Sequence, residues 1–280
     1  MRTIDVREVR ETVRRLSIRA NVELRPDVLA ALRAAREVEE APLAQDLLDT
    51  LIENARVARE DDLALCQDTG FTSVFVRIGQ QVSVQGGDFS AAVDEGVRLG
   101  YEQGELRKSI VKDAILDRTN TADNTPALIY TDIVSGDKLD ITVMPKGAGC
   151  DNQSRLAMLG PGEGVSGVKK FVRETVEASN GRACPPLVVG VGVGGSFEMA
   201  PLLAKKALLK DLDSSERSEL GQLEDELKGE VNGLGLGAMG VGGTVTALAV
   251  PVMTAPCHMA SLPVAVNLSC HSLRSAQAVI

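Results

Sequence analysis

The chain has 280 residues, of which 44% are hydrophobic and 25% charged, so it is long enough to bury one large core or two modest ones. Its net charge of −9 argues against a nucleic-acid or anionic-membrane surface, because such partners select clustered Lys and Arg. The amino end, "MRTIDVREVRETVRRLSIRA", lacks the apolar run of a secretory signal, so we expect a cytoplasmic protein that acts on small molecules or proteins.

Helices are predicted over most of the first 60 residues. Apolar residues recur every three or four positions in "DVREVRETVRRL", "PDVLAALRAAREVEE" and "PLAQDLLDTLIENARVARE". Pro26 and Pro42 stand where first turns are expected, a position that proline favours. Residues 1–60 are therefore expected to form a helical packing scaffold.

Strands and helices alternate after residue 60. A strand over 72–78 precedes the helical pattern "DFSAAVDEGVRLGYEQGEL", and the segments "ALIYTDIV" and "KLDITVMP" flank the turn "SGD", which predicts a β-hairpin. Farther on come a helix, "VSGVKKFVRETVEAS", a buried strand, "PLVVGVGVGG", and two more helices, "SFEMAPLLAKKALL" and "SSERSELGQLEDELKGEV". No repeat or low-complexity linker interrupts this order. We predict one α/β domain over 1–280, with the helical scaffold of residues 1–60 packed on a mixed sheet in the region over 61–280.

The segment from Val231 to Leu273 contains no Asp, Glu, Lys or Arg. Prolines and glycines interrupt it, and its apolar run "ALAVPVM" is far shorter than the roughly 18 residues that a membrane span requires. We interpret it as buried core and site-lining loops.

The stretch "GVGVGG" fits the pattern G-x-G-x-x-G at Gly190, Gly192 and Gly195, with Asp211 about 20 residues on. This spacing is typical of nicotinamide-dependent dehydrogenases. However, the chain after Asp211 continues into a charged helical pattern, where a dinucleotide-binding fold needs a second strand. The other interpretation is that these glycines allow close backbone packing and leave helix amides facing a ligand.

Five cysteines, an odd number without a C-x-x-C pair, argue against a disulfide framework and against zinc-ribbon spacing. Spacing alone leaves two interpretations open, namely buried thiols or a metal site that the fold assembles.

Seven motifs, in order from residue 66 almost to the carboxyl end, resemble the alpha subunit of the iron–sulfur hydro-lyases, the class I fumarase and L-tartrate dehydratase family. They are "CQDTG", "LRKS", "DNTPA", "KGAGCDN", "CPP", "VGVGGSFEMAPLLAKKALL" and "HMASLPVAVNLSCHSLR". The resemblance implies a [4Fe–4S] cluster held by Cys66, Cys184 and Cys270. Three thiolates would leave the fourth iron open to substrate, as an open position does in other catalytic metal sites.

The resemblance also implies a catalytic acid at Asp68. If residues 64–68 are extended, Cys66 and Asp68 point to the same face. The alternative is that Asp68 only caps a turn before Gly70. Further positions match the family's substrate-binding groups, and these are Gln67, Arg107, Gly149, Asn152 and His258.

A dicarboxylate gets no help from a chain of net charge −9, and surface charges are screened beyond about 8 Å, so its pocket needs cations of its own. The planar fork of Arg107 suits a carboxylate, although a solvated surface arginine is the alternative. For His258 the alternative is a satisfied core histidine. Where the fumarase form carries serine this chain has Cys150, which blurs the choice of substrate. Cys150 is expected to line the site and Cys257 to be buried, and neither is expected to be a ligand.

The family's proton-abstracting threonine, with further substrate-binding Arg and Lys residues, lies in a second region that is a separate beta subunit in some members. The resemblance therefore implies an alpha subunit that is active only with a beta subunit, in a hetero-oligomer. Reversible hydration of fumarate to malate is the favoured reaction, with L-tartrate or a methylated dicarboxylate as alternatives. A dehydrogenase and a non-catalytic interaction protein are the alternatives from other classes.

Overall fold

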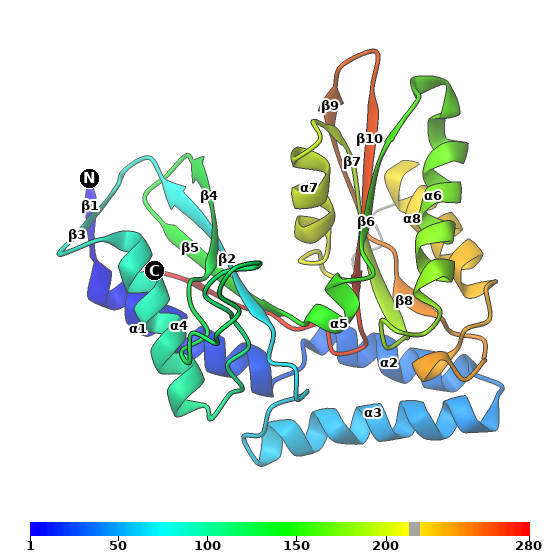
Figure 1. Ribbon diagram of the computed structural model, residues 1–280, viewed down its shortest axis with the longest axis horizontal. Coiled ribbons are helices and arrows are strands. Elements are labelled where there is room, and N and C mark those ends of the chain that lie inside the picture. Colours follow the sequence, from blue (N-terminus) through cyan, green and yellow to red (C-terminus); the bar gives the residue numbers. More distant parts are fainter. Residues whose placement is uncertain (213–218) are drawn as a thin grey trace. The chain divides into compact units, whose positions relative to one another are not determined.

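The structure, a computed structural model, describes residues 1–212 and 219–280 (Figure 1). The chain divides into two compact units. Unit 1 comprises Met1–Arg25, Asn54–Ala148 and Arg274–Ile280, whereas unit 2 comprises Pro26–Glu53 and Gly149–Leu273. Each unit combines helices with a mixed sheet, which confirms the predicted α/β class.

The helices predicted at the amino end are confirmed. They are α1 (Val6–Val22), α2 (Pro26–Val38) and α3 (Pro42–Glu60), and the last two begin at the expected prolines. Backbone amides in the first turn of a helix have no acceptor within the helix. Proline, which lacks the amide hydrogen, therefore begins a helix without the loss of a hydrogen bond. α1 belongs to unit 1 and α2 to unit 2, while the boundary between the units falls inside α3.

Unit 1 contains a four-stranded sheet in the order β11-β5-β2-β4. Its strands are β2 (Phe71–Gly79), β4 (Leu128–Val134), β5 (Leu139–Lys146) and β11 (Ala276–Val279), and β1 (Arg2–Asp5) pairs separately with β3 (Val82–Gln85). α1 packs on β5, β11 and α4 (Phe89–Gln103). Their apolar side chains form one core, in which Val13, Val97 and Ile141 are fully buried.

The predicted hairpin is wrong. Its two segments form β4 and β5, but β2 lies between them, parallel to β4 and antiparallel to β5. The turn wraps the end of β2 instead, since Gly79 N and Gln81 N donate to Lys138 O and Gly136 O, each at 2.9 Å. A turn pattern is a local signal. It does not reveal that β2, which is buried along most of its length, takes a partner on each edge.

Unit 2 contains a five-stranded sheet in the order β6-β10-β7-β8, and β9 pairs with β7 beside β8. The strands are β6 (Arg155–Leu159), β7 (Leu187–Gly195), β8 (Ala247–Ala249), β9 (Val252–Cys257) and β10 (Leu262–Ser269). β10 is antiparallel to both neighbours, whereas β8 and β9 are parallel to β7.

Helices cover both faces of this sheet, as Figure 1 shows. α6 (Gly164–Ser179) and α8 (Glu219–Asn232) pack on one face, and α7 (Met199–Ala207) packs on the other. Successive side chains of β10 point to opposite faces of the sheet. Val264 and Val266 pack in the core with α6, and Ala265 packs in the core with α7. Short helices α5 (Ala148–Asp151), η1 (Pro161–Glu163) and η2 (Ala238–Gly240) complete the fold. The helix predicted over 214–231 is confirmed from Glu219, and its start lies outside the described residues.

The glycines of "GVGVGG" allow close packing. Gly190 and Gly192 lie inside β7, where an added Cβ would stand 2.2 Å from the backbone oxygens of Ala204 and Ala200 on α7. They therefore face a packed helix instead of forming the turn that would hold a pyrophosphate. The dehydrogenase interpretation loses its basis.

The uncharged segment from Val231 to Leu273 supplies β8, β9 and β10 and much of the unit 2 core, as expected. Within the described ranges, no helix combines the length and the apolar character that crossing a bilayer requires.

Candidate active site

Residues 66–70, the loop that leads into β2, contain three of the residues predicted in unit 1, namely Cys66, Gln67 and Asp68. The segment bends at residues 65–67 and is not extended, so the predicted alternation does not apply. The bend itself brings the two reactive positions together, because Asp68 N donates to Cys66 Sγ at 3.4 Å. Cys66 Sγ in turn lies 3.4 Å from the amide oxygen of exposed Gln67.

The Asp68 carboxylate is held by two backbone amides. Oδ1 accepts from Gly70 N at 3.1 Å and Oδ2 accepts from Ala148 N at 2.8 Å. Gly70 has φ +79°, and an added Cβ there would lie 2.7 Å from the Lys146 backbone, so only glycine fits. Asp68 therefore does cap the turn before Gly70. A carboxylate held at both oxygens is also fixed relative to Cys66, which is the geometry that a proton-transfer group needs.

Three side chains hold three consecutive carbonyls of this loop. Arg274 Nη2 donates to Asp68 O, the Tyr101 hydroxyl donates to Thr69 O at 2.6 Å, and Asn124 Nδ2 donates to Gly70 O at 3.2 Å. Burial raises the pKa of Tyr101, so the phenol keeps the proton that it donates. The sequence assigned these three residues no role, although Asn124 and Arg274 lie inside quoted motifs.

Arg107 is joined to the same loop through its backbone, since Thr69 Oγ1 donates to Arg107 O. Its side chain is exposed and has no hydrogen bond or ion pair with any described residue. This exposure agrees with a solvated surface arginine and equally with a cation that is ready for an anionic ligand. Unit 1 therefore brings Cys66, Gln67, Asp68 and Arg107 to one loop system.

In unit 2 the residue after Cys270 contacts the backbone of Cys184. His271, directly after Cys270, places its backbone N 3.4 Å and its ring Nδ1 3.2 Å from Cys184 O. Cys184 has φ +56°, a left-handed conformation that is uncommon outside glycine. His271, to which the sequence assigned no function, thus links the two cysteines.

Gly149 and Asn152 lie in and directly after α5, and both are exposed. An added Cβ at Gly149 would meet nothing within 4 Å, and the Asn152 amide has no hydrogen bond to a described residue. Both are therefore accessible to a ligand, and their predicted role in substrate binding stays a prediction.

The expectations for the two remaining cysteines are wrong. Cys150 is 5% exposed and packs in the unit 2 core with α6 and the sheet, so it does not line an open site. Cys257 is exposed, because it ends β9 where the strand gives way to a turn, and its Sγ donates to Ser261 O at 3.3 Å.

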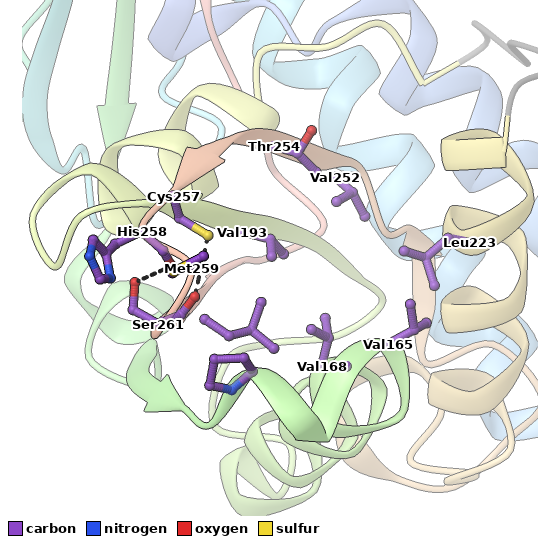
Figure 2. A pocket seen from close by; sticks show the side chains of 13 residues that line it. Val165, Val168, Val193, Leu223, Val252, Thr254, Cys257, His258, Met259 and Ser261 are labelled. Atoms are coloured by element: carbon purple, nitrogen blue, oxygen red, sulfur yellow. Dashed lines mark hydrogen bonds between the residues drawn. The ribbon is translucent and has the colours of Figure 1, made fainter.

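His258 opens this turn and is exposed, which rules out the core-histidine interpretation. Its Nδ1 accepts from Ala260 N at 3.1 Å, so the neutral ring carries its proton on Nε2. Figure 2 shows the ring at the edge of a pocket of about 430 Å³, away from Val165 and Leu223.

Apolar side chains from α6, α8, β7, β9 and β10 make up most of this pocket's lining. No Lys or Arg of the described chain lines it, so a dicarboxylate would find no counter-charge there. The apolar interior of this pocket therefore does not suit a dicarboxylate, and only His258 at its edge stays a substrate-binding candidate.

The donor chemistry of three cysteines fits an iron–sulfur cluster. All five cysteines belong to the described part of the chain, and none forms a disulfide. Cys66, Cys184 and Cys270 are half-buried, as cluster ligands must be, while Cys150 is enclosed in apolar core. Cys66 belongs to unit 1 and the other two to unit 2, and the described residues contain no ready-made group of three His, Cys, Asp or Glu ligands.

An α/β chain with half-buried thiols, a fixed carboxylate and an exposed cation is typical of metal-cofactor enzymes that handle small anions. Comparison with known proteins is more specific. The profile of the Fumerase family, described as fumarate hydratase, matches residues 10–279. The chain belongs to this family, and the resemblance noted in its motifs is confirmed over nearly its whole length.

Its relatives share that length. A Methanocaldococcus jannaschii protein, provisionally named L(+)-tartrate dehydratase subunit alpha, is 39% identical over 274 residues, covering 96% of both chains. The L(+)-tartrate dehydratase subunit alpha of Escherichia coli (strain K12) is 30% identical over 96% of this chain and 89% of its own. The protein of that name from Shigella sonnei matches equally.

Proposed function

We propose that the chain is the alpha subunit of an iron–sulfur hydro-lyase that removes water from, or adds it to, a small dicarboxylate. The observation that carries the proposal is the loop of residues 66–70. It holds a thiol, an amide and a carboxylate side by side on a backbone whose carbonyls are tied down at three successive positions. Family membership and relatives named dehydratase alpha subunits support the same reaction class.

Cys66, Cys184 and Cys270 are the proposed ligands of a [4Fe–4S] cluster. Their half-burial supports this choice, as do the left-handed Cys184 backbone and the His271 link between two of them. Cys150 and Cys257 are excluded because one is core and the other ends an exposed strand. When bound, a cluster with three protein thiolates supplies an open Lewis-acidic iron for a hydroxyl and a carboxylate.

Asp68 is the proposed proton-transfer group. Its two amide donors hold both carboxylate oxygens in place, so that the group can accept a proton from water in the hydration direction. By microscopic reversibility the same proton returns to the departing hydroxyl during dehydration.

The remaining predicted residues bind substrate. The guanidinium of Arg107, which has no partner in the described part of the chain, matches a carboxylate in shape and charge. His258 offers an Nε2 hydrogen, Gln67 and Asn152 offer exposed amides, and Gly149 leaves space for close approach.

L(+)-tartrate is the substrate that we propose first, because several relatives are named as subunits of L(+)-tartrate dehydratase. This chain matches at least 89% of the length of each of them. Fumarate and malate, which the sequence motifs favoured, come second, and the family's own description supports them. A partner beta subunit is proposed on the same footing, because the relatives are named as alpha subunits.

The test is anaerobic production of the chain together with its partner subunit, followed by iron and sulfide analysis and a substrate panel. Loss of water from tartrate gives an enol that becomes oxaloacetate, so oxaloacetate is the product to measure. The panel adds malate, fumarate and a methylated dicarboxylate. Turnover of one of them by the cluster-loaded pair supports the proposal. A loaded pair that turns over none of them refutes it and favours a non-catalytic scaffold.

A further inference from the structure

Arg274 is a buried cation that has no carboxylate partner among the described residues. The residue is 3% exposed, and its guanidinium donates from Nη2 to Asp68 O. Nε and Nη1 are buried and have no acceptor among the described residues. Burying a guanidinium for one carbonyl bond is costly, and an apolar side chain would stabilise the same position better. The contact with Asp68 gives this buried guanidinium a role that stability alone does not.

Arg274 binds the backbone carbonyl of Asp68, whereas backbone amides bind the carboxylate. Gly70 N and Ala148 N already fix the two carboxylate oxygens. The backbone carbonyl of Asp68 is the third acceptor of this residue. Its orientation sets the angle between the Asp68 side chain and the peptide that follows it. Arg274 reaches it from the segment before β11, 206 residues along the chain. Asp68 is then held at its carbonyl and at both carboxylate oxygens.

We propose that Arg274 is a positioning residue for proton transfer by Asp68. It fixes the peptide between Asp68 and Thr69, so that the carboxylate keeps one distance and one angle to the reacting oxygen. This inference rests on the proposed function, in which Asp68 moves the proton. It predicts a defect in turnover and not in substrate binding, because the Arg274 guanidinium donates to the Asp68 carbonyl and acts through that residue.

The test uses Arg274→Met, which keeps the length of the side chain but removes its donors and charge, in the cluster-loaded complex with the partner subunit. We expect kcat to fall about 10- to 100-fold, since a misplacement of 1 Å costs up to this much, while KM stays within about threefold. Arg274→Lys, which keeps one donor, should recover part of the loss.

A double-mutant cycle with Asp68→Asn distinguishes positioning from general stability. If Arg274 acts through Asp68, adding Arg274→Met to Asp68→Asn lowers kcat no further. If the double variant instead loses the product of the two single losses in kcat, the role of Arg274 is overturned and the proposed function stands. Near-normal turnover in Asp68→Asn alone overturns both.

A readout without turnover is hydrogen exchange of the Gly70 and Ala148 amides, which donate to the Asp68 carboxylate. Arg274→Met should speed their exchange more than Val13→Ala does, a core substitution in α1 of the same unit. Equal exchange in the two variants, compared at equal global stability, overturns the inference even if one variant folds poorly.

Discussion

Glu39 is a buried carboxylate that should stabilise unit 2 strongly. It is 2% exposed and lies between α2 and α3. Oε1 accepts from Glu40 N and Ala41 N at 3.0 Å and from Thr244 N at 2.9 Å. Oε2 accepts from Thr244 N at 2.9 Å and Val245 N at 3.1 Å. Four backbone amides, two of them from the glycine-rich loop before β8, thus converge on one side chain.

Glu39→Gln tests this arrangement with little change in volume. The amide keeps one oxygen, which can serve the Oε1 donors, but turns its NH₂ toward Val245 N. One hydrogen bond to a charged group is lost, at about 1.5–3 kcal/mol, and a buried amide hydrogen stays unsatisfied. The remaining bonds weaken, while the lower desolvation cost of an amide offsets part of the loss. We expect the free energy of unfolding to fall by about 2–4 kcal/mol at pH 7.

The pH dependence follows from the pKa. Burial alone would raise the pKa of Glu39, but the amides of Thr244, Ala41, Val245 and Glu40 outweigh it and lower the pKa below its ordinary 4.5. A carboxylate with a lowered folded-state pKa stabilises the fold fully above its unfolded value. This stabilisation is lost as the pH falls through the folded value. The difference in the free energy of unfolding between the wild-type protein and Glu39→Gln should therefore be largest at pH 7 and should shrink below pH 4.5.

Urea unfolding followed by circular dichroism is the assay, since the chain has no Trp. Exposed Glu40 provides the matched control, because Glu40→Gln makes the same chemical change and should shift stability by no more than about 0.5 kcal/mol. Hydrogen exchange over residues 237–247 localises the effect to the loop. Equal stability of the two variants at pH 7, or a gap that persists unchanged at pH 3, would refute the reasoning.

Three further predictions concern the proposed chemistry. Cys270→Ala should lose iron and sulfide on anaerobic reconstitution whereas Cys257→Ala should keep both, and the reverse result would overturn the ligand assignment. Asp68→Asn should retain the cluster yet lose about 10²- to 10⁴-fold in kcat, so normal turnover would reduce Asp68 to its role as a turn cap. The chain without its partner should bind iron but show no dehydratase activity on tartrate, malate or fumarate, and robust turnover by the chain alone would place the base within these 280 residues.

Local patterns in the sequence predicted most of the elements. Pro26 and Pro42 begin α2 and α3 as expected, and the apolar run of "PLVVGVGVGG" is β7. Such features depend on neighbours within a turn or two of the chain. The hairpin failed because pairing of β4 with β2 is non-local, and nothing between residues 127 and 146 encodes it.

The cysteines show the same limit at the level of the site. Cys150 follows a glycine in a polar stretch and Cys257 follows a proline in an uncharged one, yet Cys150 is core and Cys257 ends β9 exposed. Burial of a single residue in a short helix or at a strand end depends on what packs over it. The motifs could therefore nominate Cys66, Cys184 and Cys270, but could not place the other two.

The most informative parts of the site are the donors that hold the loop of residues 66–70. Tyr101, Asn124 and Arg274 stand 32, 54 and 206 residues from the carbonyls they bind. Family motifs contain the last two without a reason for them, because each acts on backbone that no motif describes. The structure supplies that reason: a loop that presents a thiol and a carboxylate has to resist rotation of its own peptides. Its reactive side chains are local in sequence, whereas the rigidity that makes them useful is assembled from the whole of unit 1.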